Sequence, residues 1–501
     1  MRSGVALDDV ITAAPEATGA LLAQIARVAS ARGIELHLVG GPVRDLLLDR
    51  PLSDVDLMVA GEAGELAAAV VAEAGEGELE FVAHDRFGTV RVESGGAHID
   101  LARLRHETYA HPGALPDVEP GSLEQDMLRR DFSVNALVCT LDPEHPAKRR
   151  PVTDLVGGLA DLARGRLRIL HPRSFHDDPT RAWRAARFAA RLDFSLDRGS
   201  RGALRDALRD GALGAVSGER FRRELQLAFD EAARGTHAGR ILRSLSDWHV
   251  LPALEPGLVL GKDRMLPLRR LSRTIAEPDW PAPRWRPWLA GLAIWLAPLP
   301  AALRRRTLER FSVRGEQAKR IVQFGRDAER TLRTLARARG RGAVDATLVD
   351  LPEETVQALY ALADAAVRRR ILRWGAEDRR RRGPVGGSDL TELGLSGPEV
   401  GRTLARIRAG FLDGEIANRE EALALAVEIA RRSTRRSRST GKRRKVARGG
   451  AIADTSVQRR RSKRSKKKAA PPALSRTSSR SSSESPSAAD SPQAPRTDRT
   501  R

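Results

Sequence analysis

The segment Glu35–Val59, ELHLVGGPVRDLLLDRPLSDVDLMV, most constrains what this chain can fold into. Its apolar start predicts a buried strand, and Gly40 and Gly41 predict a tight turn. Pro42–Leu48 then predicts a short helix, and Asp54–Val59 predicts a second strand with alternate acids. Glycines let backbone N–H groups approach an anion closely, and proline suits the first helical position. The segment therefore predicts a phosphate site at a helix start, beside paired carboxylates.

Asp54 and Asp56 are two positions apart on the predicted strand, so their side chains project from one face. Such paired carboxylates can share Mg²⁺, a hard cation that prefers oxygen ligands. A third acid, Asp100, follows an apolar approach on a later predicted strand and could complete the site if the two strands are neighbours. Isolated acid pairs are also common in turns and on solvated strand edges, so the pair alone does not establish catalysis.

A second group of polar residues lies in the segment 105–137, which begins as a Pro/Gly-rich loop and continues as a predicted helix from Ser122. Asp131 and Asn135 are four positions apart and would share a face of that helix, one turn after Arg129 and Arg130. Taken alone, this pattern is also typical of a salt-bridged surface helix.

A third group lies in DDPTRAWRAARFAARLDF, where Asp178, Arg181, Arg184 and Arg187 recur at three-residue spacing on one side of a predicted helix. An aspartate acceptor one turn from an arginine donor can imitate the hydrogen-bonding edge of a base. The alternative is an arginine stripe that binds RNA phosphates without selectivity.

Three segments in order, LVGGPVRDLLLDRPLSDVDL, RRDFSVNAL and DDPTRAWRAARFAARLDF, resemble the successive signatures of the class II tRNA nucleotidyltransferase and poly(A) polymerase family. The resemblance implies an α+β chain with a small mixed-sheet nucleotidyltransferase head. All-α neck, body and tail regions and a disordered basic extension would follow. The expected boundaries are 1–145 for the head, 146–235 for the neck, 236–430 for body and tail, and 431–501 for the extension. No histidine follows His249, which excludes the His-Asp phosphohydrolase domain that some relatives carry.

The resemblance also implies roles for single residues. Asp54 and Asp56 would bind the catalytic Mg²⁺ ions, and Asp100 is a further catalytic candidate. Asp178 and Arg181 would pair with the incoming CTP or ATP. The complete set of implied nucleotide-binding residues is Gly40, Gly41, Arg44, Arg129, Arg130, Asp131, Asn135, Asp178, Arg181, Arg184 and Arg187.

One residue departs from the family pattern, and one further segment matches it. Asp177 stands where the family usually has glutamate, which affects the expected orientation of the Asp178 and Arg181 pair more than its function. Ser217–Leu225 resembles the element that follows the neck motif, and there Glu219 and Arg220 would form structural pairs.

Positive charge is concentrated at one end of the chain. The formal net charge is +22, and residues 431–501 hold 23 Lys and Arg against 4 Asp and Glu. This extension lacks apolar periodicity and cannot bury enough surface to fold alone. RNA is its expected ligand, through salt-sensitive phosphate contacts, and a solvated tail without a partner is the alternative. The predicted RNA-binding residues are Arg379, Arg380, Arg381, Arg382, Lys442, Arg443, Arg444 and Lys445.

Cysteine content and hydropathy indicate where in the cell we expect the protein. Cys139 is the only cysteine, which excludes an internal disulfide and a cysteine-rich zinc site. The most apolar run, Trp288–Pro300, is shorter than a bilayer span and predicts a buried helix. No N-terminal signal pattern is visible, so we expect a cytoplasmic protein without membrane contact.

The leading hypothesis is a template-independent RNA 3′-end nucleotidyltransferase. It would add CMP and AMP from CTP and ATP to tRNA by two-metal phosphoryl transfer and release pyrophosphate. A poly(A) polymerase and a CC-only or A-only adding enzyme remain alternatives. A noncatalytic RNA-binding protein on the same scaffold is the alternative from another class, and the sequence does not indicate the oligomeric state.

Overall fold

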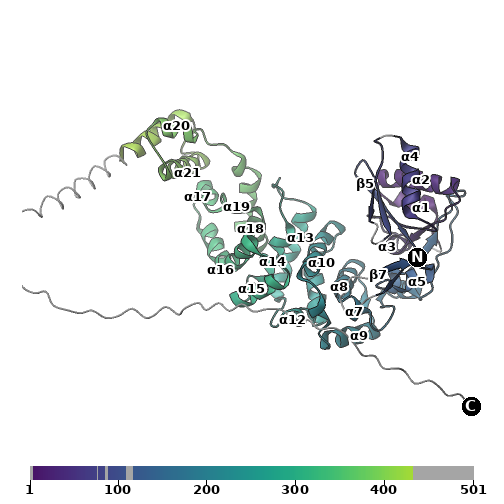
Figure 1. The fold of residues 1–501 in the computed structure, drawn as a ribbon. Coiled ribbons are helices and arrows are strands. Elements are labelled where there is room, and N and C mark those ends of the chain that lie inside the picture. The colour runs from purple at the N-terminus through teal and green to yellow at the C-terminus, as the bar shows by residue number, and fades with distance from the viewer. Residues whose placement is uncertain (1–3, 76, 85–87, 109–116, 433–501) are drawn as a thin grey trace, which may run out of the picture. The chain divides into compact units, whose positions relative to one another are not determined.

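The computed structural model describes residues 4–75, 77–84, 88–108 and 117–432, all within one compact unit, Met1–Ser433 (Figure 1). The basic extension predicted from residue 431 lies outside the described residues from position 433 onward. The predicted RNA contacts Lys442, Arg443, Arg444 and Lys445 therefore also lie outside them.

The head contains a six-stranded sheet within the described residues, in the order β3-β4-β5-β2-β1-β8. Strands β2 and β5 run parallel, and the other neighbouring strands run antiparallel. The predicted mixed sheet is therefore confirmed. Its strands are β1 (Leu36–Val39), β2 (Asp56–Val59), β3 (Glu80–His84), β4 (Thr89–Ser94), β5 (Ala97–Arg103) and β8 (Val138–Thr140).

The alternation of side chains gives this sheet two different faces. Leu57 and Leu101 point into the main hydrophobic core, where α2 and α4 pack against the sheet. Met58 belongs to a smaller hydrophobic cluster on the opposite face. Asp56 lies two positions before Met58 on the same strand, so its side chain points to that face too. Asp100 pairs directly with Asp56 and shares its face. The helices on the core side are α1 (Leu7–Ala13), α2 (Glu16–Ala31) and α4 (Ala63–Ala74).

Short elements connect the sheet to the rest of the head. The turn after β1 leads into α3, and a hairpin and α5 precede the segment that enters β8. These elements are α3 (Gly41–Leu47), β6 (Arg105–Thr108), β7 (Asp117–Pro120), α5 (Leu123–Leu128) and the 3-10 helix η2 (Ser133–Asn135).

Beyond β8 the described chain is helical apart from the short parallel pair β9 (Arg166–Leu167) and β10 (Ser195–Leu196). The first helices are α6 (Gly158–Ala163), α7 (Ser174–Asp177), α8 (Arg181–Leu192), α9 (Arg198–Arg209), η3 (Ala212–Ala215), α10 (Gly218–Asp230), η4 (Glu231–Arg234), α11 (Ala238–Asp247) and α12 (Val250–Leu254). They are followed by η5 (Lys262–Arg264), α13 (Met265–Ala276), α14 (Pro287–Leu296), α15 (Ala301–Arg310), α16 (Gly315–Arg337), α17 (Gly340–Leu348), α18 (Glu353–Leu362), α19 (Ala365–Ala376), η6 (Asp378–Arg380), α20 (Gly387–Glu392), α21 (Pro398–Asp413) and a helix over 419–432.

Aromatic packing holds the first helices together. The Trp183 ring of α8 meets Phe311 edge-on at a centroid distance of 5.8 Å, and Trp295 of α14 lies 6.4 Å from the same ring. Helix α14 is buried from Trp288 to Leu296, which confirms the helix predicted from this apolar run. In the described residues, no helix is long and apolar enough to cross a membrane.

The helix predicted from Ser122 through Asn135 is wrong beyond its first turns. Ser122 caps α5 as expected, but the helix ends at Leu128. Phe132 is extended and pairs with Ile169, while its N–H donates to the Asp131 carboxylate at 2.9 Å. A local side-chain bond and a tertiary bridge therefore replace the continued helix.

The prediction that Asp178 shares a helix with the neck arginines is also wrong. Asp178 is extended, with φ −133° and ψ 94°, and α8 begins only at Arg181. Pro179 explains this break, because the residue before a proline is disfavoured in the helical region. The Asp178 carboxylate instead accepts bonds from the Thr180 N–H at 3.0 Å and hydroxyl at 2.6 Å.

The contact between α14 and α10 gives a test of this packing. A Cβ at Gly291 would lie 1.9 Å from Phe229 Cζ, so Gly291→Ala should destabilise the protein by about 1–3 kcal/mol through overpacking. Urea unfolding measures the change. Gly202→Ala in α9 is the control, because no heavy atom lies within 4 Å of its Cβ and alanine favours a helix over glycine. Equal effects at both sites would contradict the described packing.

Candidate active site

A cleft of about 900 Å³ lies between the polar face of the head sheet and the neck helices. It collects side chains from the β1–α3 turn, strands β2 and β5, the segment after α5, and α8. Every head and neck residue predicted as a site residue lines it: Gly40, Gly41, Arg44, Asp54, Asp56, Asp100, Arg129, Arg130, Asp131, Asn135, Asp178, Arg181, Arg184 and Arg187.

Gly40 shapes the turn that opens the cleft. Its φ of +72° is a conformation that side chains rarely adopt, and a Cβ there would lie 2.7 Å from Arg130 Nη1. Arg130, from the predicted polar group in the segment 105–137, therefore packs directly against the turn. Glycine is required at this position for both its backbone conformation and the close approach of Arg130.

The three predicted acids lie at the junction of β2 and β5. Asp56 and Asp100 occupy paired positions on these parallel strands, as predicted if the strands were neighbours. Asp56 is exposed to the cleft, although the protein around it removes part of the hydration of its carboxylate. This desolvation, reinforced by the negative charges of Asp100 and Asp54, raises the pKa of Asp56 to about 6.

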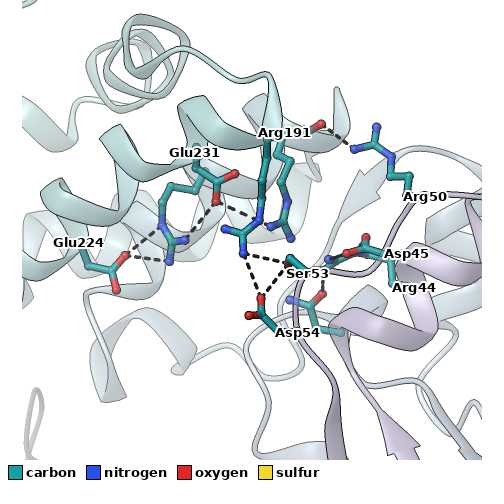
Figure 2. Close-up of polar contacts among 11 residues, drawn as sticks. Arg44, Asp45, Arg50, Ser53, Asp54, Arg191, Glu224 and Glu231 are labelled. Atoms are coloured by element: carbon teal, nitrogen blue, oxygen red, sulfur yellow. Dashed lines mark hydrogen bonds and ion pairs between the residues drawn. The ribbon is translucent and has the colours of Figure 1, made fainter. Parts of the chain in front are cut away.

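The partners of the other two acids differ. Arg91 on β4 donates to both carboxylate oxygens of Asp100, at 2.7 and 2.9 Å. Asp54 accepts a bond from Ser53 Oγ at 2.8 Å and from Arg234 Nη2 at 3.0 Å (Figure 2). Within the described residues, no group of three or more acids, histidines or cysteines is arranged to hold a metal ion.

The donor chemistry at Asp54 and Asp56 nevertheless fits a divalent cation. Both residues offer carboxylate oxygens, the ligands that hard cations prefer. Desolvation, followed by the negative charges of Asp100 and Asp54, raises the pKa of Asp56, and a bound cation would favour its ionised form. Asp100 is a less direct candidate, because Arg91 occupies both of its oxygens.

A network of polar side chains joins the neck to the glycine turn. Arg184 on α8 binds Asp131 with Nε at 2.8 Å, and Asp131 accepts a bond from Asn135 Nδ2 at 2.9 Å. Asn135 in turn accepts a bond from Arg44, whose guanidinium also binds Asp45 at 2.8 and 2.9 Å (Figure 2). Arg44 is only 1% exposed, so it lines the cleft with its charge already engaged.

This network shifts the pKa values of Asp131 and Arg184 in opposite directions. Burial alone would raise the pKa of Asp131, but Arg184, the Asn135 hydrogen bond and Arg181 together lower it to about 2. The charge of Asp131 correspondingly raises the pKa of Arg184. The pair stays ionised at neutral pH and ties the head to the neck.

Arg129 and Arg130 are both held by the buried Asp126, with donor–acceptor distances of 2.8 Å for Arg129 Nε and Arg130 Nη2. Arg129 also binds Glu107 at 2.8 Å. Arg130 reaches the Asn135 carbonyl at 3.4 Å, which brings it to the glycine turn.

The predicted base-selecting residues occupy the same cleft, and the Arg181 N–H donates to the Asp178 carbonyl at 3.0 Å, but their side chains bind other partners. The nearly buried Arg181 donates to Ser174 Oγ at 2.6 Å and to the Arg129 carbonyl at 2.9 Å. Asp178 accepts a bond from Arg220 on α10 at 2.8 Å. Arg220 was expected to form a structural pair, and it does so while lining the cleft.

Arg187 is held deeper, between two glutamates. It contacts Glu224 at 3.1 Å and Glu231 at 3.4 Å (Figure 2). Arg191, one turn along α8, lies 3.8 Å from Glu231. Burial, followed by repulsion from Arg44, lowers the pKa of Arg191 to about 10.

Several cleft residues were not predicted as site residues: Arg91, Arg191, Arg220, Arg223 and Arg234. Arg191 continues the helical spacing of Arg184 and Arg187, so the same pattern could have found it. Arg91 faces Asp100 across the β4–β5 hairpin, in a register that was not predicted. Arg234 has no such local signal, since its partner Asp54 is 180 positions away.

The predicted RNA-binding arginines in the helical part are only partly free for RNA. Arg379 binds Glu353 at 2.8 Å and lies 4.8 Å from the centre of the Trp374 ring. Arg380, Arg381 and Arg382 are exposed, and Arg381 lies 4.7 Å from the centre of the Phe411 ring.

The Asp131–Arg184 pair predicts a pH-dependent effect on stability. Because the pKa of Asp131 falls from 3.8 to about 2 on folding, its stabilisation is complete above pH 4 and is lost as the pH falls through 2. Asp131→Asn should therefore lower the free energy of unfolding at pH 7 by roughly 2 kcal/mol, with a smaller difference from wild type near pH 2.

Denaturant unfolding at several pH values measures this effect. Asp206→Asn is the matched control, because Asp206 forms an exposed pair with Arg209 and should change stability little. A constant difference between wild type and Asp131→Asn across the acid range would contradict the assignment.

Comparison with known proteins confirms the resemblance in the sequence motifs. Residues 36–168 match the Poly A polymerase head domain. An A-adding tRNA nucleotidyltransferase of Geobacter sulfurreducens is 30% identical over 428 residues, which cover 83% of this chain and 47% of that protein. An A-adding tRNA nucleotidyltransferase of Halalkalibacterium halodurans is 30% identical over 426 residues, which cover 82% of this chain and 92% of that protein.

Solved structures agree with the sequence matches. The apo form II of a CCA-adding enzyme is 26% identical, with a TM-score of 0.67 over 85% of this chain and 99% of that chain. A CCA-adding enzyme in complex with CTP is 25% identical, with a TM-score of 0.64 over 85% of this chain and 98% of that chain. The chain thus spans about half the length of the Geobacter relative and nearly all of the Halalkalibacterium relative. It belongs to the tRNA nucleotidyltransferase family.

Proposed function

We propose that this protein adds CMP and AMP from CTP and ATP to the 3′ end of tRNA. The observation that carries the proposal is the cleft that unites Asp54 and Asp56 with the arginines of head and neck. Nucleotidyl transfer requires carboxylates that can hold a metal, cations that can bind a triphosphate, and hydrogen-bonding groups that can pair with a base.

In this reaction the RNA 3′-hydroxyl attacks the α-phosphate of the nucleotide, a new phosphodiester bond forms, and pyrophosphate leaves with the electrons of the broken bond. Nucleotidyltransferases of this type generally use divalent metals, and we propose Mg²⁺ held by Asp54 and Asp56. When bound, it would supply charge stabilisation to the reacting phosphate. Arg129 and Arg130 flank the carboxylates and would hold the triphosphate by charge-assisted hydrogen bonds.

Nucleotide choice is assigned to Asp178 and Arg181. Asp178 offers acceptor oxygens and Arg181 offers N–H donors on the neck side of the cleft, the two kinds of group that a base edge can pair with. The bonds that Arg181 makes to Ser174 and the Arg129 carbonyl restrict its side chain. A restrained donor loses less conformational entropy on binding a base edge than a mobile one does, which favours affinity.

RNA binding outside the cleft is assigned to Arg380, Arg381 and Arg382, which are exposed and adjacent. Their role would be phosphate contact rather than sequence selection. Arg379 contributes less directly, because Glu353 already pairs with it.

A-only addition is a second candidate function, favoured by the names of the two relatives that match most of this chain. CC-only addition and poly(A) synthesis use the same chemistry, so the chain's own product must discriminate among them. A noncatalytic RNA-binding protein would not require the paired acids Asp54 and Asp56 in the cleft.

The product assay tests the proposal directly. Purified full-length protein should extend tRNA lacking its 3′ CCA with CTP and ATP in the presence of Mg²⁺, and sequencing should show CCA ends. Extension only of tRNA ending in CC would identify A-only addition, and extension stopping at CC would identify CC-only addition. Long adenosine tracts on unstructured RNA would identify poly(A) synthesis, and no incorporation on any RNA would exclude the enzymatic function.

Asp56→Asn tests the carboxylate assignment in the same assay. We expect turnover to fall about a hundredfold or more, because a catalytic metal contributes several kcal/mol of transition-state stabilisation. Thermal unfolding and tRNA binding should show that the variant remains folded and binds RNA. Near-normal turnover would remove Asp56 from the proposed metal site.

Asp178→Ala tests nucleotide choice. Losing a base-edge acceptor should lower kcat/KM for the accepted nucleotides by about ten- to a hundredfold and change the ratio between CTP and ATP. Arg220→Gln is the comparison, because Arg220 binds Asp178. If both variants lower efficiency equally and leave the CTP/ATP ratio unchanged, Asp178 acts by holding Arg220 and does not select the base.

A further inference from the structure

Arg234 at the end of η4 reaches from the helical part of the chain to the predicted metal-binding segment of the head. Its Nη2 lies 3.0 Å from Asp54 Oδ2 and 2.9 Å from Ser53 Oγ, at the contacts drawn beside these two residues in Figure 2. Ser53 Oγ donates to the same Asp54 oxygen at 2.8 Å. One carboxylate oxygen therefore receives both a guanidinium and a hydroxyl donor.

This ion pair can separate at low cost. The side chains of Arg234 and Asp54 are 36% and 55% exposed, so water can replace each partner. Exposed ion pairs contribute little to stability, whereas carboxylate oxygens are the ligands that hard divalent cations prefer. A cation at Asp54 would compete with Arg234 for the same oxygen.

The surroundings of Arg234 favour an anion as its next partner. Arg44 and Arg191 line the same cleft. Burial, followed by the charges of Arg44 and Arg234, lowers the pKa of Arg191, whereas Glu231 and Asp45 act in the opposite direction. These guanidinium groups are near enough to repel one another, and Arg44 is already committed to Asp45 and Asn135. A polyphosphate would relieve that repulsion, and a guanidinium can bind phosphate through two parallel bonds.

We propose that Arg234 is an exchangeable cation of the active site. It neutralises Asp54 while no metal is bound, and it transfers to the β- and γ-phosphate oxygens of the nucleoside triphosphate when Asp54 binds a divalent cation. This inference deepens the proposed function and rests on it. It assigns a triphosphate contact to a residue outside the three sequence motifs.

Two consequences distinguish this role from a structural one. Removing the guanidinium should remove a competitor for Asp54 and so strengthen the binding of a divalent metal alone. The same change should weaken the binding of polyphosphate in the presence of metal. A residue that only stabilises the fold would give neither opposite shift.

The experiment compares wild type, Arg234→Gln and Arg234→Lys with Arg240→Gln as the matched control. Arg240 forms an exposed ion pair with Asp193 at 2.5 Å and does not line the cleft. Mn²⁺ binding without nucleotide is followed by the electron paramagnetic resonance signal of free Mn²⁺. We expect Arg234→Gln to bind Mn²⁺ about three- to fivefold more tightly, the effect of losing an exposed ion pair.

The second measurement is calorimetric binding of inorganic tripolyphosphate at saturating Mg²⁺. Arg234→Gln should bind it about tenfold more weakly, as expected for the loss of one charge-assisted contact, and Arg234→Lys should recover part of this affinity. The KM values for CTP and ATP should rise by a common factor with a smaller change in kcat, because the triphosphate is common to both nucleotides. Arg240→Gln should match wild type in all three measurements.

The outcomes separate this inference from the proposed function. Wild-type protein that extends tRNA, together with unchanged Mn²⁺ and tripolyphosphate affinities in Arg234→Gln, would overturn the inference and leave the function standing. A lower thermal stability of that variant with unchanged affinities would also overturn it and identify a structural pair. Wild-type protein that adds no nucleotide to any RNA would instead overturn the function.

Discussion

The geometry of the cleft depends on the ion pair between Asp131 and Arg184. Arg184 belongs to α8, whereas Asp131 follows α5 in the head, so this contact fixes the neck against the sheet. Asp131 also binds Asn135, and Asn135 accepts from the buried Arg44 beside the glycine turn. The base side and the phosphate side of the cleft are therefore parts of one hydrogen-bonded network. Such networks in a low-dielectric interior restrain their members more strongly than isolated surface pairs do.

Charge within the cleft is balanced unevenly. Asp126 pairs with both Arg129 and Arg130, Glu107 also pairs with Arg129, and Arg91 pairs with Asp100. Asp56 has the opposite environment, since desolvation and the like charges of Asp100 and Asp54 raise its pKa to about 6 although it is exposed to the cleft. A carboxylate in this environment opposes folding, because its charge is less stable in the folded protein than in water. This unfavourable contribution to folding is consistent with a cation-binding role for Asp56, because groups with shifted pKa values concentrate at functional sites.

The local parts of the fold could be predicted from the sequence. The strand, turn and helix of the segment 35–59 follow from apolar periodicity and from the two glycines, and the pairing of Asp100 with Asp56 needed only that their strands be neighbours. Prediction failed where tertiary contacts or a proline overrode helical spacing. Phe132 bridges to Ile169 and ends the helical pattern, yet Asp131 and Asn135 still meet through a different local conformation. The correct pair was thus predicted from an incorrect helix.

The long-range ion pairs had no comparable signal, because a chain with 87 Lys and Arg offers many partners for each acid. The structure shows which arginine pairs with which acid and how far each pair is buried. The degree of burial determines whether a pair can separate at low cost. Asp131 is 7% exposed, so removing Arg184 would leave a buried charge and cost several kcal/mol. Arg234 and Asp54 remain open to water, so either can change its partner without that penalty. Two similar arginine–aspartate pairs in one cleft therefore have different consequences: the buried pair fixes the geometry, and the exposed pair can exchange when phosphate and metal bind.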